Sequence, residues 1–119
     1  MLRFTANLSL LFTEVELIDR FKAAKDAGFE AVEIQFPYSL PPETILQKLR
    51  HYDLKLVLFN VDADDLLQGG EGLAAVPEKQ NRFLEAVDQT FEYARILKPE
   101  IINVLPGCSH DTNRHLEYL

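Results

Sequence analysis

The sequence predicts an α/β fold in which parallel β/α units form roughly half of a TIM (β/α)8 barrel. Strand-like and helix-like segments alternate along all 119 residues. Residues 54–61 are almost continuously apolar, which is typical of a parallel strand covered on both faces. Gly28 and Pro99 separate helix-like segments from the strands that follow them. We therefore expect a single partial-barrel domain, 1–119, with about four β/α units and an incomplete last helix.

The first unit begins with a short extended segment, residues 2–7, which ends at the polar Asn7. Thr13 and Glu16 have the spacing of a capping box, so a helix is expected to begin at Thr13. Gly28 favours the left-handed conformation that commonly ends a helix. The apolar residues on one stripe of this helix are Leu17, Ile18, Phe21, Ala24 and Ala27.

The second strand is expected over residues 29–36, and Pro37 closes it because proline cannot donate to a strand ladder. Pro41 and Pro42 suit the first turn of the next helix, where a missing amide costs little. The third strand covers residues 54–61. The buried face of the second helix is predicted to consist of Ile45, Leu46, Leu49 and Tyr52.

A long loop follows the third strand, and its glycine run at 69–72 predicts a mobile flap over the strand ends. A helix is then expected over residues 78–97, and a fourth strand over 101–105. Pro106 and Gly107 turn the chain into the incomplete last helix. The predicted inner residues of the 78–97 helix are Phe83, Val87, Phe91 and Ala94.

Composition argues against several classes of partner. With 19 acidic and 12 basic residues the formal net charge is -7, so nucleic acid is not an expected partner. The apolar runs are far shorter than the roughly 20 residues that cross a bilayer, so no membrane partner is expected. The single cysteine excludes an internal disulfide, and no leader pattern precedes Phe4. A cytoplasmic location is the resulting expectation.

Four consecutive parallel units lay down a curved sheet with its helices on one face. The other face would then have no cover, and the first and last strands would have open edges. We therefore expect either a homo-oligomer or completion of the barrel by a missing C-terminal half.

Functional residues of such folds lie at the carboxyl ends of strands and in the loops that follow. A carboxylate such as Glu33 in a barrel interior needs a partner, and it is either a structural hydrogen-bonding group or a substrate contact. The asparagines either contact substrate or close turns. The polar residues at predicted strand ends are Asn7, Glu33, Gln35, Asn60 and Asn103.

Two other groups of polar residues do not fit a metal site. The acidic residues Asp62, Asp64 and Asp65 fail as a calcium loop, because Leu66 and Leu73 occupy ligand positions. The C-terminal group lacks zinc-site spacing, and a nucleophilic thiol would need a positioned base, which the sequence alone does not show. This group consists of Cys108, His110, Asp111 and His115. We predict no metal site and no cofactor in this chain.

Several segments together resemble the hydroxypyruvate isomerase family, which includes the 2-oxo-tetronate isomerases. The similarity runs through essentially all of the chain but covers about the first half of the family's barrel. The segments are RFTANLSLLFTEVELIDRF, AGFEAVEIQFPY, LVLFN, GLAAVP, FEYAR and INVLPG.

The resemblance implies isomerisation of a small hydroxy-carbonyl acid, such as hydroxypyruvate to tartronate semialdehyde, with a divalent metal as an option in the full-length family member. It places the catalytic glutamates in the other half of the barrel, so this chain is expected to be inactive alone and its own catalytic residues are unknown. Asn7, Glu33, Phe36, Pro37, Tyr38 and Asn60 match the family pattern at the barrel mouth. The substrate-binding residues that we predict are Asn7, Glu33, Tyr38, Asn60 and Asn103.

This chain departs from the family at two places. Asn103 stands where the family often has histidine, and the glycine run at 69–72 lacks a bulky residue of the family's loop. Two alternatives to the isomerase also stay open. One is a non-catalytic half-barrel that assembles with a copy of itself or binds a small ligand. The other is a metal-dependent phosphodiesterase of the endonuclease type, which the acidic charge disfavours.

Overall fold

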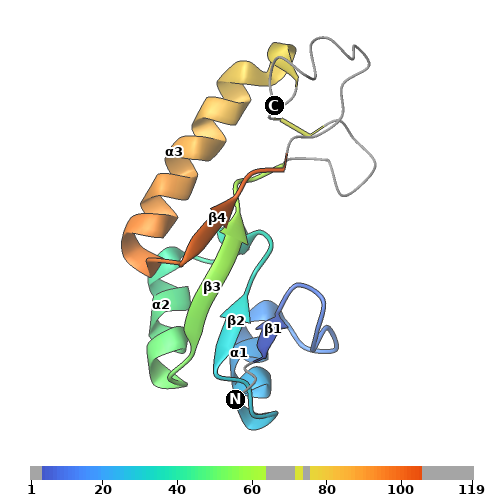
Figure 1. The fold of residues 1–119 in the computed structure, drawn as a ribbon, viewed down its shortest axis with the longest axis vertical. Coiled ribbons are helices and arrows are strands. Elements are labelled where there is room, and N and C mark those ends of the chain that lie inside the picture. Colours follow the sequence, from blue (N-terminus) through green and yellow to red (C-terminus); the bar gives the residue numbers. More distant parts are fainter. Residues whose placement is uncertain (1–3, 64–71, 74–75, 106–119) are drawn as a thin grey trace. The chain divides into compact units, whose positions relative to one another are not determined.

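The computed structural model describes residues 4–63, 72–73 and 76–105. Its strands form one sheet in the order β1-β2-β3-β4 (Figure 1). The pairs β1 with β2 and β2 with β3 are parallel, which confirms the predicted β/α architecture. The elements are β1 (Thr5–Asn7), α1 (Leu17–Asp26), β2 (Ala31–Glu33), η1 (Pro37–Ser39), α2 (Pro42–His51), β3 (Lys55–Asn60), η3 (Pro77–Lys79), α3 (Gln80–Leu97) and β4 (Ile101–Asn103).

The chain divides into two compact units, and each has its own buried cluster. The first lies within Met1–Phe59 and Tyr93–Ile102, and the second within Asn60–Glu92 and Asn103–Leu119. The single domain expected over 1–119 stays a prediction.

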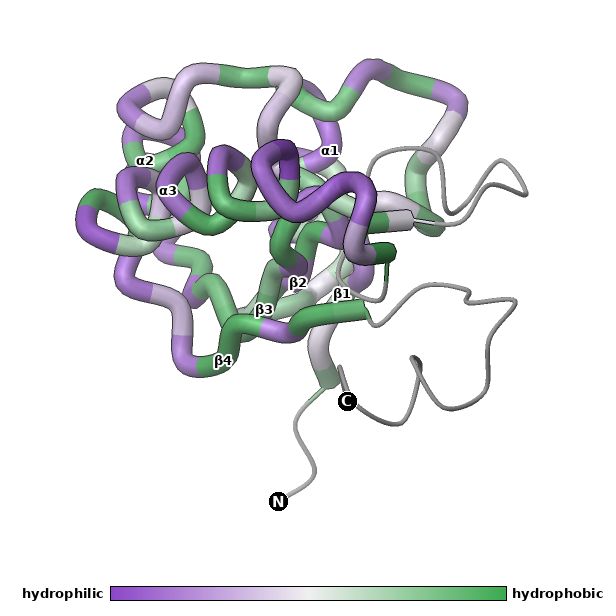
Figure 2. Tube along the Cα trace, turned by 90° about the horizontal axis from the view of Figure 1, so that it is seen from above, coloured by the Kyte–Doolittle hydropathy of each residue, from purple (hydrophilic) through white to green (hydrophobic). Residues whose placement is uncertain are grey.

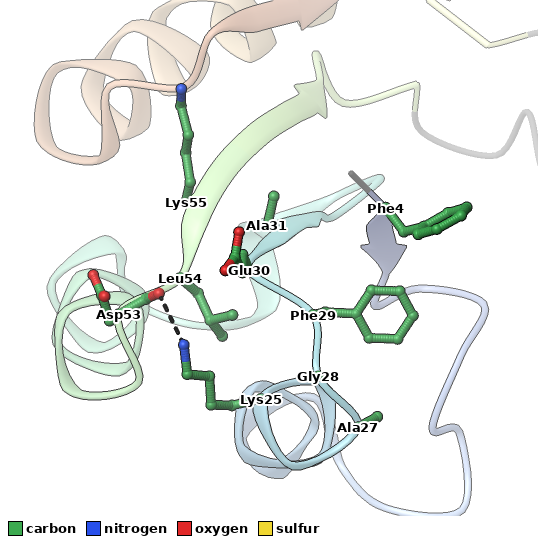
Figure 3. A pocket seen from close by; sticks show the side chains of 10 residues that line it. All are labelled: Phe4, Lys25, Ala27, Gly28, Phe29, Glu30, Ala31, Asp53, Leu54 and Lys55. Carbon is green, nitrogen blue, oxygen red and sulfur yellow. Dashed lines mark hydrogen bonds between the residues drawn. The ribbon is translucent and has the colours of Figure 1, made fainter. Parts of the chain in front are cut away.

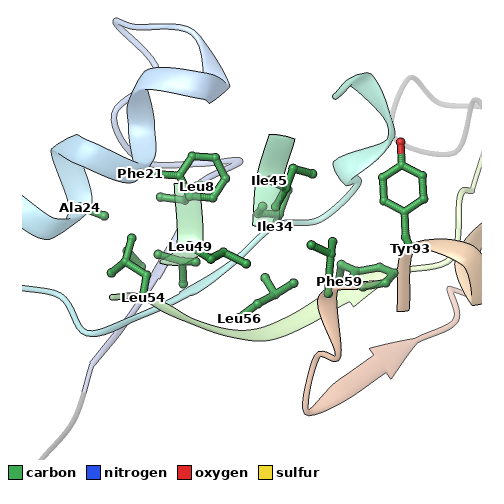
Figure 4. Close-up of a cluster of buried hydrophobic side chains, with 13 residues drawn as sticks. Leu8, Phe21, Ala24, Ile34, Ile45, Leu49, Leu54, Leu56, Phe59 and Tyr93 are labelled. Carbon is green, nitrogen blue, oxygen red and sulfur yellow. The ribbon is translucent and has the colours of Figure 1, made fainter. Parts of the chain in front are cut away.

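In the first unit, α1 and α2 lie on the same side of β1, β2 and β3 (Figure 2). Phe21 of α1 and Ile45 of α2 are fully buried (Figure 4). Ala6 of β1 and Val32 of β2 are fully buried as well. Burial of one large apolar side chain stabilises a fold by about 1.5–3 kcal/mol. This cluster therefore fixes the sheet against the helices and sets which strand residues face the other way.

The second unit has a smaller core of Val61, Leu73 and Ala86, with Phe83 and Val87 packed against it. Next to Val61, the carboxylate of Asp62 accepts a 2.6 Å hydrogen bond from the guanidinium of Arg82. The amide of Val61 donates to the carbonyl of Asn103 over 2.9 Å.

The capping box predicted at Thr13 and Glu16 is wrong, because α1 begins at Leu17. Glu16 is the extended N-cap residue and makes no side-chain cap. Phe12 has a φ of 61°, a left-handed conformation that cannot continue into a helix. Ala27, placed on the buried stripe, is exposed beyond the end of α1.

The second strand is shorter than expected because the amide of Gln35 leaves the ladder and donates to the hydroxyl of Ser9 over 2.9 Å. On α3 the predicted inner residue Phe91 is 66% exposed. The buried positions of this helix are Ala86, Thr90, Tyr93 and Leu97. Thr90 fits there because its hydroxyl donates to the carbonyl of Ala86 over 2.8 Å.

Candidate functional site

Asn7 and Glu33 lie side by side at the carboxyl ends of β1 and β2. They are register partners, and Nδ2 of Asn7 donates to Oε1 of Glu33 over 3.2 Å. The preceding residues Ala6 and Val32 are fully buried under the helices. Since strand side chains alternate between faces, the pair projects from the sheet face away from α1 and α2. The structure thus brings together two of the five predicted substrate-binding residues.

A register irregularity falls at this pair. Val32 pairs with Leu56, whereas Glu33 pairs with Leu58, so Val57 is passed over. Bulges of this kind re-aim side chains and are over-represented beside functional sites. The shift occurs at the strand residue that carries the carboxylate.

Asn7 also shapes the loop that follows β1. Its Oδ1 accepts the amide of Ser9 over 2.9 Å, an Asx turn. Its main-chain carbonyl accepts the amides of Leu10 and Leu11 over 3.1 and 2.9 Å. Turn closure, one of the two alternatives for this asparagine, is therefore observed, and contact with a substrate stays a prediction.

Arg20 of α1 closes the same loop from the other side. Its guanidinium donates to the carbonyl of Leu8 over 2.8 Å and to that of Val15 over 2.9 Å. These bonds satisfy two carbonyls that no strand or helix uses. The loop that carries Ser9 is consequently fixed at both of its ends.

Ser9 is a site residue that the sequence reasoning missed. Its hydroxyl accepts the amide of Gln35, which connects the loops after β1 and β2. The available signal was its position two residues after a strand-ending asparagine, the spacing of an Asx turn.

Tyr38, the third predicted residue, lies in η1 and packs among aromatic rings. Its ring is 5.0 Å from that of Tyr93 and 6.3 Å from that of Phe59, both in edge-to-face geometry. The hydroxyl of Tyr93 donates to the carbonyl of Leu40 over 2.7 Å. The ring of Tyr38 thus packs against two other aromatic rings, and its role toward a substrate stays a prediction.

Asn60 and Asn103, the two remaining predicted residues, belong to the second unit. Asn60 is 6% exposed at the end of β3. Asn103 is exposed at the end of β4. Their roles toward a substrate also stay predictions.

A groove of 780 Å³ lies at the opposite end of the strands, where β2 and β3 begin (Figure 3). Phe4, Phe29 and Lys25 line it, and Nζ of Lys25 donates to the carbonyl of Asp53 over 3.5 Å. Lys55, another lining residue, pairs with the carboxylate of Glu100. Because function in parallel β/α folds concentrates at the carboxyl ends of strands, we take Asn7 and Glu33 as the candidate site.

Within residues 4–63, 72–73 and 76–105, no group of three His, Cys, Asp or Glu side chains has the arrangement of a metal site. Glu33 offers one carboxylate, and the atom of Asn7 that faces it is the amide nitrogen, which is not a metal ligand, so these two residues alone do not make a divalent-ion site. The group of Cys108, His110, Asp111 and His115 lies outside the described residues, as do Asp64, Asp65, residues 69–71 of the glycine run and the last predicted helix. Among the helices that the structure describes, none is long and apolar enough to cross a membrane.

Comparison with known proteins supports the TIM-barrel fold. A profile of the family described as xylose isomerase-like TIM barrel matches residues 21–118. The chain is similar to a crystal structure of AP endonuclease, family 2, from Brucella melitensis, with a TM-score of 0.90 and 35% identity. That similarity covers 99% of this chain and 46% of the other.

Curated relatives are similar over nine-tenths of this chain. A 2-oxo-tetronate isomerase of Pectobacterium atrosepticum is 43% identical over 107 residues, which are 90% of this chain and 41% of that protein. The Escherichia coli hydroxypyruvate isomerase is 39% identical, over 90% of this chain and 42% of its own length. The human putative hydroxypyruvate isomerase is 43% identical, over 89% and 39%. The chain thus spans about two-fifths of the length of these relatives.

Proposed function

This chain belongs to the xylose isomerase-like TIM-barrel family, and from that premise we propose that it supplies the N-terminal part of a hydroxypyruvate or 2-oxo-tetronate isomerase. The observation that carries the proposal is the 43% identity to a 2-oxo-tetronate isomerase across 90% of the chain. The Asn7 and Glu33 pair at the strand ends supports it, because a small hydroxy-carbonyl acid needs both donors and acceptors. We propose a cytoplasmic location with it.

The reaction is an isomerisation in which a proton leaves the carbon beside a carbonyl and another carbon of the same substrate receives one. Hydroxypyruvate becomes tartronate semialdehyde without any net gain or loss of atoms. We assign binding roles to this chain. The Glu33 carboxylate accepts a hydrogen bond from a substrate hydroxyl, and the Asn7 amide orients that carboxylate.

Catalysis needs a base at the reacting carbon, and the resemblance places the family's catalytic glutamates beyond this part of the barrel. We therefore propose that the chain is inactive by itself. The described residues do not fit a metal, so no step is assigned to one here.

Reconstitution tests the proposal. The purified 119-residue chain is mixed with the remaining C-terminal part of the Pectobacterium isomerase, and hydroxypyruvate and 2-oxo-tetronate conversion are measured. We expect turnover only when both parts are present. Turnover by this chain alone would contradict the inactivity, and a folded pair that converts neither acid would contradict the isomerase assignment.

Variants of the chain sharpen this experiment. Glu33→Gln removes the charge but keeps the shape, and we expect the paired enzyme to lose about 10- to 100-fold in kcat/KM. Thr13→Ala is the matched control, because Thr13 is exposed in the same part of the chain and makes no cap. It should leave kcat/KM unchanged.

The alternative is a non-catalytic half-barrel that assembles with a second copy or binds a small ligand. The exposed apolar residues Ile101, Ile102 and Val104, at and after β4, favour it. The name of the Brucella protein raises an endonuclease as a further candidate, but the net charge of -7 opposes DNA binding. Failure to bind abasic DNA at low salt would remove it.

A further inference from the structure

We propose that Ser9 is a positioning residue that holds Asn7 in the orientation needed to meet Glu33. The proposal rests on the proposed function, since it treats Glu33 as the residue that meets the substrate and Asn7 as the residue that orients its carboxylate. Ser9 has no hydrogen bond to Glu33 among the described contacts, so it acts through its neighbours.

The first step is the orientation of the Asn7 amide. Its oxygen and nitrogen have nearly the same shape, so a neighbouring donor or acceptor decides which faces the carboxylate. The amide of Ser9 lies 2.9 Å from Oδ1 of Asn7. With Oδ1 held there, Nδ2 is the group that faces Oε1 of Glu33, 3.2 Å away. The reversed amide would set two oxygens against each other at the carboxylate.

The second step is the position of Ser9 itself. Its hydroxyl oxygen accepts the amide of Gln35 over 2.9 Å, from a residue 26 positions along the chain. Gln35 follows Glu33 by two residues, so this bond ties the Asn7 loop to the segment that carries the carboxylate. Ser9 and Gln35 are both half-buried, which limits replacement of the bond by water.

The three bonds form a chain that runs from Gln35, just after β2, through Ser9 to Asn7 and back to Glu33 of β2. Loss of the hydroxyl removes the bond that anchors Ser9 to Gln35, so the main-chain amide of residue 9 holds Oδ1 of Asn7 less firmly. The substrate then meets a pair that is no longer preorganised, which weakens binding more than it slows the chemical step. The expected kinetic signature is a raised KM with little change in kcat.

Nuclear magnetic resonance of the 119-residue chain tests the geometry without activity. In the unmodified chain the amide of Gln35 should be protected from exchange, and the side-chain NH₂ signals of Asn7 should be shifted from those of a solvated amide. Ser9→Ala should speed Gln35 exchange about tenfold and return the Asn7 signals toward solvated values. Ser9→Thr keeps the hydroxyl and should restore both, and Thr13→Ala should change neither.

Kinetics of the reconstituted enzyme test the consequence. Ser9→Ala and Asn7→Ala should each raise KM about tenfold. The double variant should resemble Asn7→Ala alone, because both changes remove one interaction. Additive effects would overturn the proposal, since Ser9 would then act by a separate route.

The resonance and kinetic experiments distinguish a failure of the positioning role from a failure of the isomerase assignment. If the pair of chains has no activity but the Asn7 and Gln35 signals respond as stated, the isomerase assignment fails and the positioning role stands. If Gln35 exchanges freely in the unmodified chain, or if Ser9→Ala leaves the Asn7 signals unchanged, the positioning role is wrong whatever the activity.

Discussion

Asn7 bonds through its side-chain oxygen, its side-chain nitrogen and its main-chain carbonyl, whereas the side chain of Glu33 has one hydrogen bond within the described residues, to Asn7. The two residues thus differ in how much of the local structure depends on them. Stability measurements on variants of the two residues can therefore distinguish a turn-closing role from a ligand-binding role.

We expect Asn7→Ala to lower the free energy of unfolding by about 1–2 kcal/mol, because the amide of Ser9 loses its acceptor. Glu33→Gln should change it by less than about 0.5 kcal/mol, since the amide oxygen still accepts from Asn7. Urea unfolding of both variants measures the difference. Equal and large losses would make Glu33 a structural carboxylate, the alternative that its sequence context left open.

Tyr38 gives a second prediction at the scale of one side chain. Tyr38→Ala removes the ring contacts with Tyr93 and Phe59, so it should cost about 2–3 kcal/mol of stability. Tyr38→Phe keeps the rings in contact and should cost less than about 1 kcal/mol. Thermal unfolding compares them, and a Tyr38→Ala chain as stable as the parent would refute the packing role.

The sequence was sufficient to choose Asn7 and Glu33, because a polar residue at the end of an apolar strand is conspicuous. It was not sufficient for Ser9, since its importance comes from Gln35, which only the folded chain brings near. The packing of Tyr38 could not be predicted either, because its aromatic neighbour Tyr93 lies 55 positions further along the sequence.

The three described α-helices are each followed closely by a residue in the left-handed conformation. Gly28 after α1, Asp53 after α2 and Lys98 after α3 all have positive φ values, of 97°, 50° and 50°. After α1, the amides of Gly28 and Phe29 return to the carbonyls of Lys25 and Ala24, a Schellman motif. One of the three positions carries glycine, so the other two bear the cost of a Cβ in the left-handed region.

Exchanging these residues should change stability in opposite directions. Lys98→Gly should raise the free energy of unfolding by about 1 kcal/mol, because it removes that cost. Gly28→Ala should lower it by about 1–2 kcal/mol, and crowding would not contribute, since a Cβ there meets no atom within 4 Å. Differential scanning calorimetry tests the pair, and shifts of the same sign would contradict the explanation.

The order of the elements and the helix end at Gly28 could be predicted from the sequence pattern, whereas the start of α1 could not. Thr13 and Glu16 have the right spacing for a cap, yet the loop bonds from Arg20 and Asn7 hold the preceding residues in turns. Long-range contacts of this type override a local signal. Phe91 illustrates the same limit, because an apolar residue on a helix need not lie on its buried stripe.

For the molecule as a whole, apolar side chains remain exposed at an edge of the sheet. Ile101 is 52% exposed and Ile102 39% exposed, both in β4. Exposed apolar edge strands promote pairing with other chains. A homo-oligomer, or completion by a C-terminal half, stays our prediction for the way this edge is covered.

We expect sedimentation velocity to show an oligomer of the 119-residue chain that Ile101→Lys shifts toward monomer, because a charge on an edge strand opposes pairing. Leu84→Lys is the matched control, since Leu84 is 53% exposed on α3. An unmodified chain that stays monomeric at high concentration would contradict self-association. If both variants shift the chain toward monomer, the self-association does not depend specifically on β4.

The loop closed by Arg20 and Asn7 is held at both of its ends by hydrogen bonds within the chain. A small acid that binds beside this loop would therefore not have to order a flexible segment. Titration calorimetry with such an acid at several temperatures should therefore show only a small change in heat capacity on binding, because no loop has to become ordered around the ligand.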